Sequence, residues 1–125
     1  MEATYKRLRT EVEKVQKLQK EIQKCFQAHR QLSAQLSENE NVKEDLSQLE
    51  DSNTVFKLVG PVLLKQDLSE AKETVNKRIS FINAELKRQD DRIKELEKQQ
   101  EGCREQITKL QQRLQQEQTK AALKA

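Results

Sequence analysis

The fold is decided near the middle of the chain by residues 53–64, which read NTVFKLVGPVLL. β-Branched and aromatic residues are concentrated in residues 54–59, and a second apolar run follows at residues 62–64; such runs favour extended strands. Gly60 and Pro61 lie between them and form the strongest turn signal in a chain with two glycines and one proline. The stretch therefore predicts a β-hairpin over residues 53–66, in preference to a plain loop between helices.

On both sides of the hairpin, apolar residues recur every seven residues, with a second series offset by three. This is the a and d pattern of coiled-coil helices. Before the hairpin, the a positions are Leu8, Val15, Ile22, His29 and Leu36, and the d positions are Leu18, Cys25, Leu32, Asn39 and Leu46. After it, the a positions are Ile79, Leu86, Ile93, Gln100, Ile107 and Leu114, and the d positions are Leu68, Val75, Ile82, Gln89, Leu96, Cys103 and Leu110. Asp67, with Glu70 three residues later, is the expected N-cap of the second helix.

The two helices are predicted to pair antiparallel, in a register in which the numbers of facing residues sum to 118. This register places Ile22 against Leu96, and its centre falls beside Gly60. The expected fold class is mainly α: two long helices in an antiparallel coiled coil, joined by one β-hairpin that assembles into an intersubunit β-barrel. The chain then forms a single domain over 1–125, with one helix over 1–51, the hairpin over 53–66 and the second helix over 67–123.

Polar residues interrupt the seam between the predicted helices. His29 faces Gln89 in this register, and a hydrogen bond between them would fix the register at some cost in stability. Gln100 and Asn39 face apolar residues, so we expect both to be partly exposed. Gly102 is expected to weaken its helix by about 1 kcal/mol relative to Ala.

The composition excludes several functions. Charged residues make up 36% of the chain, but the formal net charge is only +3. With one His, one Tyr and no Trp, the chain has few side chains for acid–base or cofactor chemistry, so we expect neither an enzyme nor a cofactor. No apolar run is long enough to span a membrane, and residues 1–10 lack the apolar segment of a signal peptide. We therefore expect a soluble, cytoplasmic protein.

Two residues have the spacing of metal ligands. Cys25 and His29 are four residues apart, on one face of a helix. Two further ligands are missing, so we assign both to the seam and expect no metal site. Cys103 lies about 15 Å along the rod from Cys25 in the predicted register, which is too far for a disulfide. Both cysteines should remain thiols, as in a reducing compartment.

A basic cluster near the start of the chain contains Lys6, Arg7 and Arg9. Basic helices that precede zippers bind the major groove in some transcription factors. Acidic residues at positions 2, 11 and 13 flank the cluster, however, and phosphate binding requires a dense positive stripe. We expect a solvated helix face, with no nucleic-acid partner and no membrane partner.

The predicted hairpin needs partners. An isolated two-stranded hairpin is marginal in water, and this one carries apolar side chains on both faces and two open edges. Open apolar edges favour pairing with further strands. We therefore expect hairpins from several chains to pair edge to edge. The expected oligomerisation residues are Val55, Phe56, Leu58, Val59, Gly60, Pro61, Val62, Leu63 and Leu64.

Antiparallel pairing would bring the far ends of the two helices together. Helix ends fray, because their terminal groups lack intrahelical partners. Apolar residues there either end the seam or, when intermittently exposed, hold a non-native polypeptide, and we weigh these two interpretations equally. The candidate contact residues are Tyr5, Leu8, Val12, Leu110, Leu114 and Leu123.

Residues 53–64, set between two long heptad helices, resemble the β-class subunits of prefoldin. The continuation over residues 68–88 is similar to one particular eukaryotic subunit type of that family. The resemblance spans nearly the whole chain and is specific around the hairpin, because any coiled coil shares the composition of the helices. A single hairpin fits the β class, whereas α-class subunits carry two.

The resemblance implies a hexamer of two α-class and four β-class chains, with a double β-barrel platform and six coiled-coil tentacles. It implies an ATP-independent chaperone that captures unfolded or nascent chains, notably actin and tubulin, and passes them to the cytosolic group II chaperonin. Two alternatives stay open at this point. One is a structural coiled-coil tether or scaffold without client holding, and the other is a DNA-binding zipper.

Overall fold

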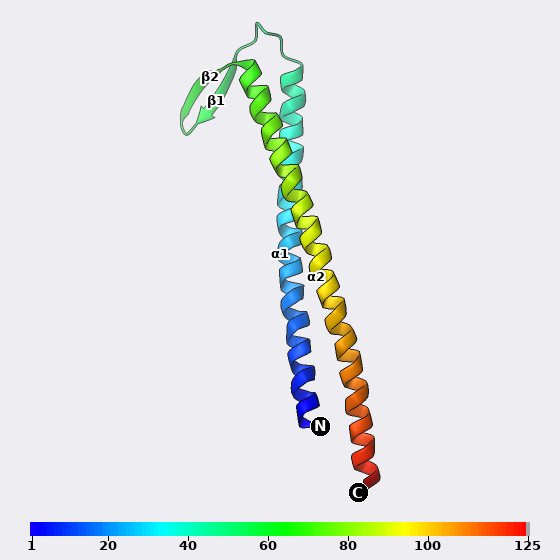
Figure 1. Ribbon diagram of the computed structural model, residues 1–125. Coiled ribbons are helices and arrows are strands. Elements are labelled where there is room, and N and C mark those ends of the chain that lie inside the picture. Colours follow the sequence, from blue (N-terminus) through cyan, green and yellow to red (C-terminus); the bar gives the residue numbers. More distant parts are fainter. Residues whose placement is uncertain (125) are drawn as a thin grey trace. The chain divides into compact units, whose positions relative to one another are not determined.

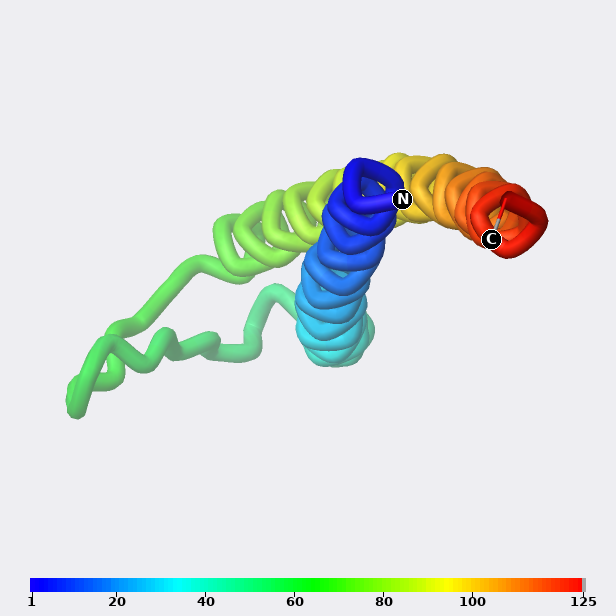
Figure 2. Tube along the Cα trace, turned by 90° about the horizontal axis from the view of Figure 1, so that it is seen from below, coloured from blue at the N-terminus to red at the C-terminus, as the bar shows by residue number. Residues whose placement is uncertain are grey.

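The computed structural model describes residues 1–124. Its elements follow in the order α1 (Glu2–Ser47), β1 (Val55–Val59), β2 (Val62–Gln66) and α2 (Leu68–Lys124) (Figure 1). Both helices trace as unbroken coils, α1 from blue to cyan and α2 from green to red (Figure 2). The predicted pair of long helices and the antiparallel hairpin are confirmed. The chain divides into two units, one of Met1–Gln27 with α2 from Asp90 onward, the other Ala28–Gln89.

The heptad positions explain why these sequences form paired helices. Every a and d residue named above is buried or half-buried, while the positions between them are mostly exposed. Leu96 is the most deeply buried large side chain, at 1% exposure. A narrow apolar stripe with a wide charged face is what two helices in contact along one seam require.

In the unit formed by Met1–Gln27 and the later part of α2, the two helices run antiparallel. Thr4 contacts Glu117 at one end, and Glu21 pairs with Arg92, 3.4 Å away, at the other. The α-amino group of Met1 lies 3.3 Å from Glu117, a pair that the predicted register places face to face. Ile22, Ile93, Leu96 and Leu110 are buried in this unit.

The sequence expectation for Gln100 is wrong. Its side chain is only 5% exposed, as deeply buried as its apolar neighbours on the seam. Gln100 Nε2 donates to Gln19 Oε1 at 3.0 Å and lies 3.4 Å from the Val15 carbonyl oxygen. Gln100 faces the apolar Leu18 in the predicted register. The neighbouring Gln19, at the side of the seam, supplies the acceptor for the Gln100 amide. Asn39 is half-buried, as expected, and its Nδ2 donates to the Gln35 carbonyl in its own helix.

In the unit Ala28–Gln89, the core lies where the helices meet the hairpin. Leu46, Ala71 and Val75 are buried together, and the half-buried residues Leu49, Val55, Leu68 and Ile79 pack against them. Ala71 belongs to neither heptad series, and its small side chain completes this cluster. Through Val55, the first residue of β1 is tied to the ends of both helices.

The helix α1 ends at Ser47, before the predicted bound of 51. Its last turn tightens, with Gln48 N donating to the Asp45 carbonyl and Leu49 N to that of Leu46. The chain then turns at Glu50, whose N–H donates to Asn53 Oδ1 at 2.7 Å. Local side-chain acceptors of this kind compete with helix continuation.

The helix α2 runs from Leu68, directly after Asp67, to Lys124, whereas the predicted bounds are 67 and 123. The Asp67 carbonyl accepts the first helical hydrogen bond, from Ala71 N at 3.0 Å. Between the helices, β1 and β2 form a two-stranded antiparallel sheet in which Val55 pairs with Gln66 and Val59 with Val62. Gly60 has φ of 59°, a conformation that side chains with a Cβ rarely adopt. A positive-φ Gly at the first position of a two-residue turn suits a type II′ hairpin.

Candidate functional site

The hairpin places its side chains on two faces, because successive residues of a strand point to opposite sides. Residues directly opposite one another in the pairing share a face. One face therefore carries Val55, Lys57, Val59, Val62, Leu64 and Gln66. The other carries Phe56, Leu58, Leu63 and Lys65. Each face combines large apolar side chains with one lysine.

Apart from Val55 and Gln66, which are half-buried, the side chains on both faces of the hairpin are exposed. The exposed apolar residues are Phe56, Leu58, Val59, Val62, Leu63 and Leu64, with exposed fractions from 48% for Val59 to 68% for Leu58. Val55 alone among the hairpin's apolar side chains packs against the core cluster of its unit. So large an exposed apolar surface on a marginal two-stranded sheet is typical of an interaction site.

The expected client-contact residues lie in the unit that contains both chain ends. Tyr5, Val12 and Leu123 are exposed, Leu123 most of all at 82%. Leu8 and Leu114 are half-buried in the seam. Leu110 is only 5% exposed, so the structure places it in the core of the helix pair rather than among accessible side chains.

The seam near the chain ends closes on a polar network that the sequence reasoning missed. Thr4 Oγ1 donates to both carboxylate oxygens of Glu117, at 3.1 Å each. Arg113 Nε also donates to Glu117, at 3.2 Å, and Gln118 Nε2 donates to the Tyr5 hydroxyl at 3.1 Å. Thr4 and Glu117 both continue the d series, fourteen residues before Leu18 and seven after Leu110. Extending the heptads through polar residues would have found them.

This network changes the acidity of Glu117. Partial desolvation is the largest single influence and raises the pKa, but hydrogen bonds from the Met1 α-amino group, Thr4 and Arg113, with the charge of that amino group, outweigh it. The pKa of Glu117 is therefore lowered from its ordinary value of 4.5. The carboxylate is held ionised by donors from both helices.

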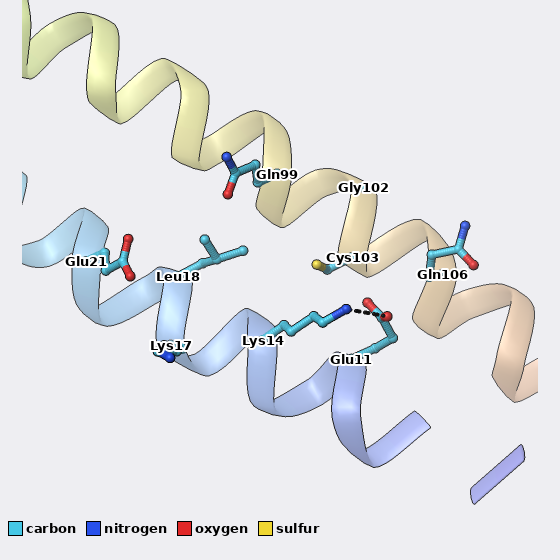
Figure 3. Close-up of a pocket in the computed structure, with 9 residues that line it drawn as sticks. All are labelled: Glu11, Lys14, Lys17, Leu18, Glu21, Gln99, Gly102, Cys103 and Gln106. Carbon is cyan, nitrogen blue, oxygen red and sulfur yellow. Dashed lines mark hydrogen bonds and ion pairs between the residues drawn. The ribbon is translucent and has the colours of Figure 1, made fainter. Parts of the chain in front are cut away.

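A groove lies on the same unit, between the helices, beside Leu18, Gly102 and Cys103 (Figure 3). Lys14 pairs with Glu11 at its rim, 3.3 Å apart. Desolvation raises the pKa of the Cys103 thiol above 9.0, and the hydrogen bond to Glu11 and its negative charge raise it further, against the opposing charge of Lys14. The thiol is therefore mostly protonated near neutral pH.

The residue pair considered for metal binding is placed in the seam. Cys25 and His29 are both half-buried, and His29 Nδ1 lies 3.5 Å from Ser33 Oγ. Over residues 1–124, no three His, Cys, Asp or Glu side chains gather where they could hold a metal ion. Within the same range, no helix combines the length and apolar character needed to cross a membrane.

Comparison with known proteins places these features in a family. A family model described as prefoldin subunit matches residues 9–121. Prefoldin subunit 6 of Homo sapiens is 49% identical over 121 residues, which cover 97% of this chain and 94% of that protein. Prefoldin subunit 6 of Arabidopsis thaliana is 52% identical over 99 residues, which cover 79% of this chain and 77% of that protein.

The fold has solved counterparts as well. The crystal structure of the prefoldin beta subunit from Thermococcus strain KS-1 matches with a TM-score of 0.76, covering 82% of this chain and 90% of that one, at 19% identity. This likeness concerns the fold alone. The resemblance of residues 53–64 to β-class prefoldin subunits is confirmed, and the eukaryotic type that residues 68–88 resemble is subunit 6. With its single hairpin between two heptad helices, the chain belongs to the prefoldin subunit family.

Proposed function

We propose that the chain assembles through its hairpin into a hexameric prefoldin complex of two α-class and four β-class subunits. The hairpins would close an intersubunit β-barrel, which covers the exposed apolar side chains and pairs the free strand edges. The observation that carries this proposal is the exposure of Phe56, Leu58, Leu63 and their neighbours in a hairpin that has no cover of its own.

The proposed activity of the complex is that of a cytoplasmic, ATP-independent holdase. It would capture unfolded or nascent polypeptides such as actin and tubulin and deliver them to the cytosolic group II chaperonin, without catalysing a reaction. Tyr5, Val12 and Leu123 support this, because they expose apolar surface in the unit that contains both chain ends. Leu8 and Leu114 would join them where the seam frays, and Leu110 would stay in the seam. Weak contacts repeated over six subunits give avidity while each remains reversible.

Assembly is tested by native mass spectrometry of the chain mixed with α-class and other β-class prefoldin subunits. Leu63→Asp should be lost from the hexamer, because it places a charge among apolar barrel residues. Ser80→Asp is the matched control, a charge at an exposed position of α2 in the same unit. Entry of the Leu63→Asp chain into the hexamer at wild-type yield would contradict the barrel.

Client holding is tested by aggregation of chemically unfolded actin in the presence of the hexamer. Joint replacement of Tyr5, Val12 and Leu123 by Ser should abolish suppression and leave assembly intact. Val42→Ser, which also removes an exposed apolar side chain of α1, is the control. Unchanged suppression, or lasting binding to a native folded partner instead, would favour the tether alternative.

A further inference from the structure

The free edge of β1 presents specific backbone groups. The two-residue turn makes Val59 and Val62 a hydrogen-bonded pair. Hydrogen-bonded and non-hydrogen-bonded pairs alternate in an antiparallel sheet, so Lys57 and Val55 also direct their N–H and C=O groups toward β2. The groups of Phe56 and Leu58 point outward instead. A strand that adds to β1 must pair with these two residues.

This hydrogen-bonding pattern determines which residues would lie opposite one another if a second copy of the chain paired with the β1 edge. We consider two β1 strands (Val55–Val59) paired antiparallel over their full length about a two-fold axis. The backbone of Phe56 then forms hydrogen bonds with that of Leu58 in the other copy, and the central residue of one strand lies opposite the same residue of the other. Lys57 would then lie opposite Lys57 at a non-hydrogen-bonded site, where Cα atoms are only about 4.5 Å apart and side chains are closest. Like charges directly opposite each other destabilise strand pairing.

The strands of the hairpin contain no acidic residue that could pair with Lys57. Residues 53–66 contain two lysines and no acidic residue, and the Lys57 side chain is exposed. If the strand β2 of another copy paired with β1 instead, in the register of the hairpin itself, Lys57 would face Leu64. A strand with Asp or Glu at its centre would satisfy the lysine and keep the backbone pairing.

We propose that Lys57 prevents the β1 edge from pairing with a second copy of this chain and directs it to a sister-subunit strand that carries an acidic residue at the facing position. This inference rests on the proposed assembly through the hairpin and specifies the chemistry of the neighbour. Lys65 serves as an internal comparison. In a full-length two-fold pairing of β2 strands (Val62–Gln66), Lys65 faces Leu63 rather than itself.

The experiment uses the Lys57→Glu chain as the probe, since it supplies a strand of the same shape with an acidic centre. Wild type and Lys57→Glu, distinguished by an isotope label, are mixed in equal amounts at low salt and examined by native mass spectrometry. Mixed dimers should exceed the statistical share, with an association constant about tenfold above either homotypic pair. The excess should shrink at 1 M salt, where the screening length is about 3 Å.

Two further chains complete the design. Lys57→Leu should self-associate about tenfold more strongly than wild type, because the repulsion is gone. Wild type mixed with Lys65→Glu should show a statistical distribution. A statistical mixture with Lys57→Glu, the same excess with Lys65→Glu, or no association of either Lys57 variant would overturn the proposal.

The proposed role of Lys57 and the proposed assembly through the hairpin can fail independently. Measuring whether the Leu63→Asp chain enters the prefoldin hexamer distinguishes the two failures. If Leu63→Asp is excluded while the Lys57 mixtures stay statistical, the hairpin assembles but Lys57 does not select its neighbour. If Leu63→Asp enters normally, assembly through the hairpin itself is wrong.

Discussion

Gln100 on α2 donates a hydrogen bond to Gln19 on α1 at 3.0 Å, and the donor is almost completely buried. The two residues lie 81 positions apart in the sequence. The contact is therefore made only when the helices are in register, and it marks a polar layer in the seam, between the apolar residues Leu96 and Leu110. Such layers specify pairing at a cost in stability.

Replacing Gln100 by Leu should stabilise the chain by about 1–2 kcal/mol, because an apolar side chain fits this site and Gln19 is exposed enough to bond water. Thermal unfolding followed by circular dichroism measures the change. Gln99→Leu, on the exposed neighbouring position, is the control and should have little effect. A fall in the melting temperature of Gln100→Leu would mean that the hydrogen bonds of Gln100 contribute more than the burial of a leucine.

The His29–Gln89 layer remains a prediction, and both residues are half-buried. Converting both to Leu should raise the melting temperature. A double-mutant cycle with the two single variants tests whether they act as a pair. Additive effects, within about 0.5 kcal/mol, would show that the two side chains do not interact.

The two glycines should respond oppositely to alanine. Gly102 lies within α2 with no atom near the position of an added Cβ, so Gly102→Ala should raise stability by up to about 1 kcal/mol. Gly60 also has room, but its φ of +59° disfavours a Cβ. Gly60→Ala should destabilise the hairpin by about 1–2 kcal/mol, seen as roughly tenfold faster amide exchange in β1 and β2. If the amides of β1 and β2 exchanged at the same rate in Gly60→Ala as in wild type, this prediction would be contradicted.

Glu117 gives the chain a pH dependence of defined sign. Its pKa is lower in the folded chain than its ordinary value of 4.5, so the ionised carboxylate stabilises the fold above that pH. The contribution is lost as the pH falls through the lowered value. The melting temperature of wild type should exceed that of Glu117→Gln near pH 7, and the difference should shrink as the pH falls below 4.5. Glu105→Gln, an exposed position on the same helix, should show no such convergence.

Cys103 should react slowly with alkylating agents near neutral pH, because its raised pKa leaves little thiolate. The pH at which alkylation reaches half its maximal rate should lie above 9.0. Glu11→Gln should lower that midpoint, since the carboxylate raises the pKa by both its hydrogen bond and its charge. Glu13→Gln does not alter the groove and serves as the control. A midpoint that does not move in Glu11→Gln would exclude the proposed contact.

Local patterns predicted most of the fold. The heptad residues such as Ile22 and Leu96 are buried because they repeat with the period of a helix pair. The hairpin forms where a β-branched and aromatic run before Gly60 and an apolar run after Pro61 flank the turn. The sequence pattern predicts an end of α1 at residue 51, four residues later than the observed Ser47. The Glu50–Asn53 turn depends on a side-chain acceptor, which carries no periodic signal.

The candidate site was predictable in part. The exposure of the hairpin is predictable from the sequence, because the hairpin contains more apolar residues than two helices can cover. Which end residues are accessible did not follow. Leu110 at a d position and Leu114 at an a position are both seam residues by sequence, yet one is buried and the other half-buried. The burial of a seam residue also depends on which side chains of the opposite helix lie against it.

The sequence by itself determined two heptad helices around a hairpin that cannot shelter its own apolar side chains, since periods of seven and of two are local properties of a chain. Only the tertiary structure decided that Gln100 is buried on Gln19 and that Thr4 meets Glu117 across 113 residues. These contacts depend on the lengths and positions of individual side chains on opposite helices. A repeat pattern states which face is turned inward, but not which polar atoms meet there.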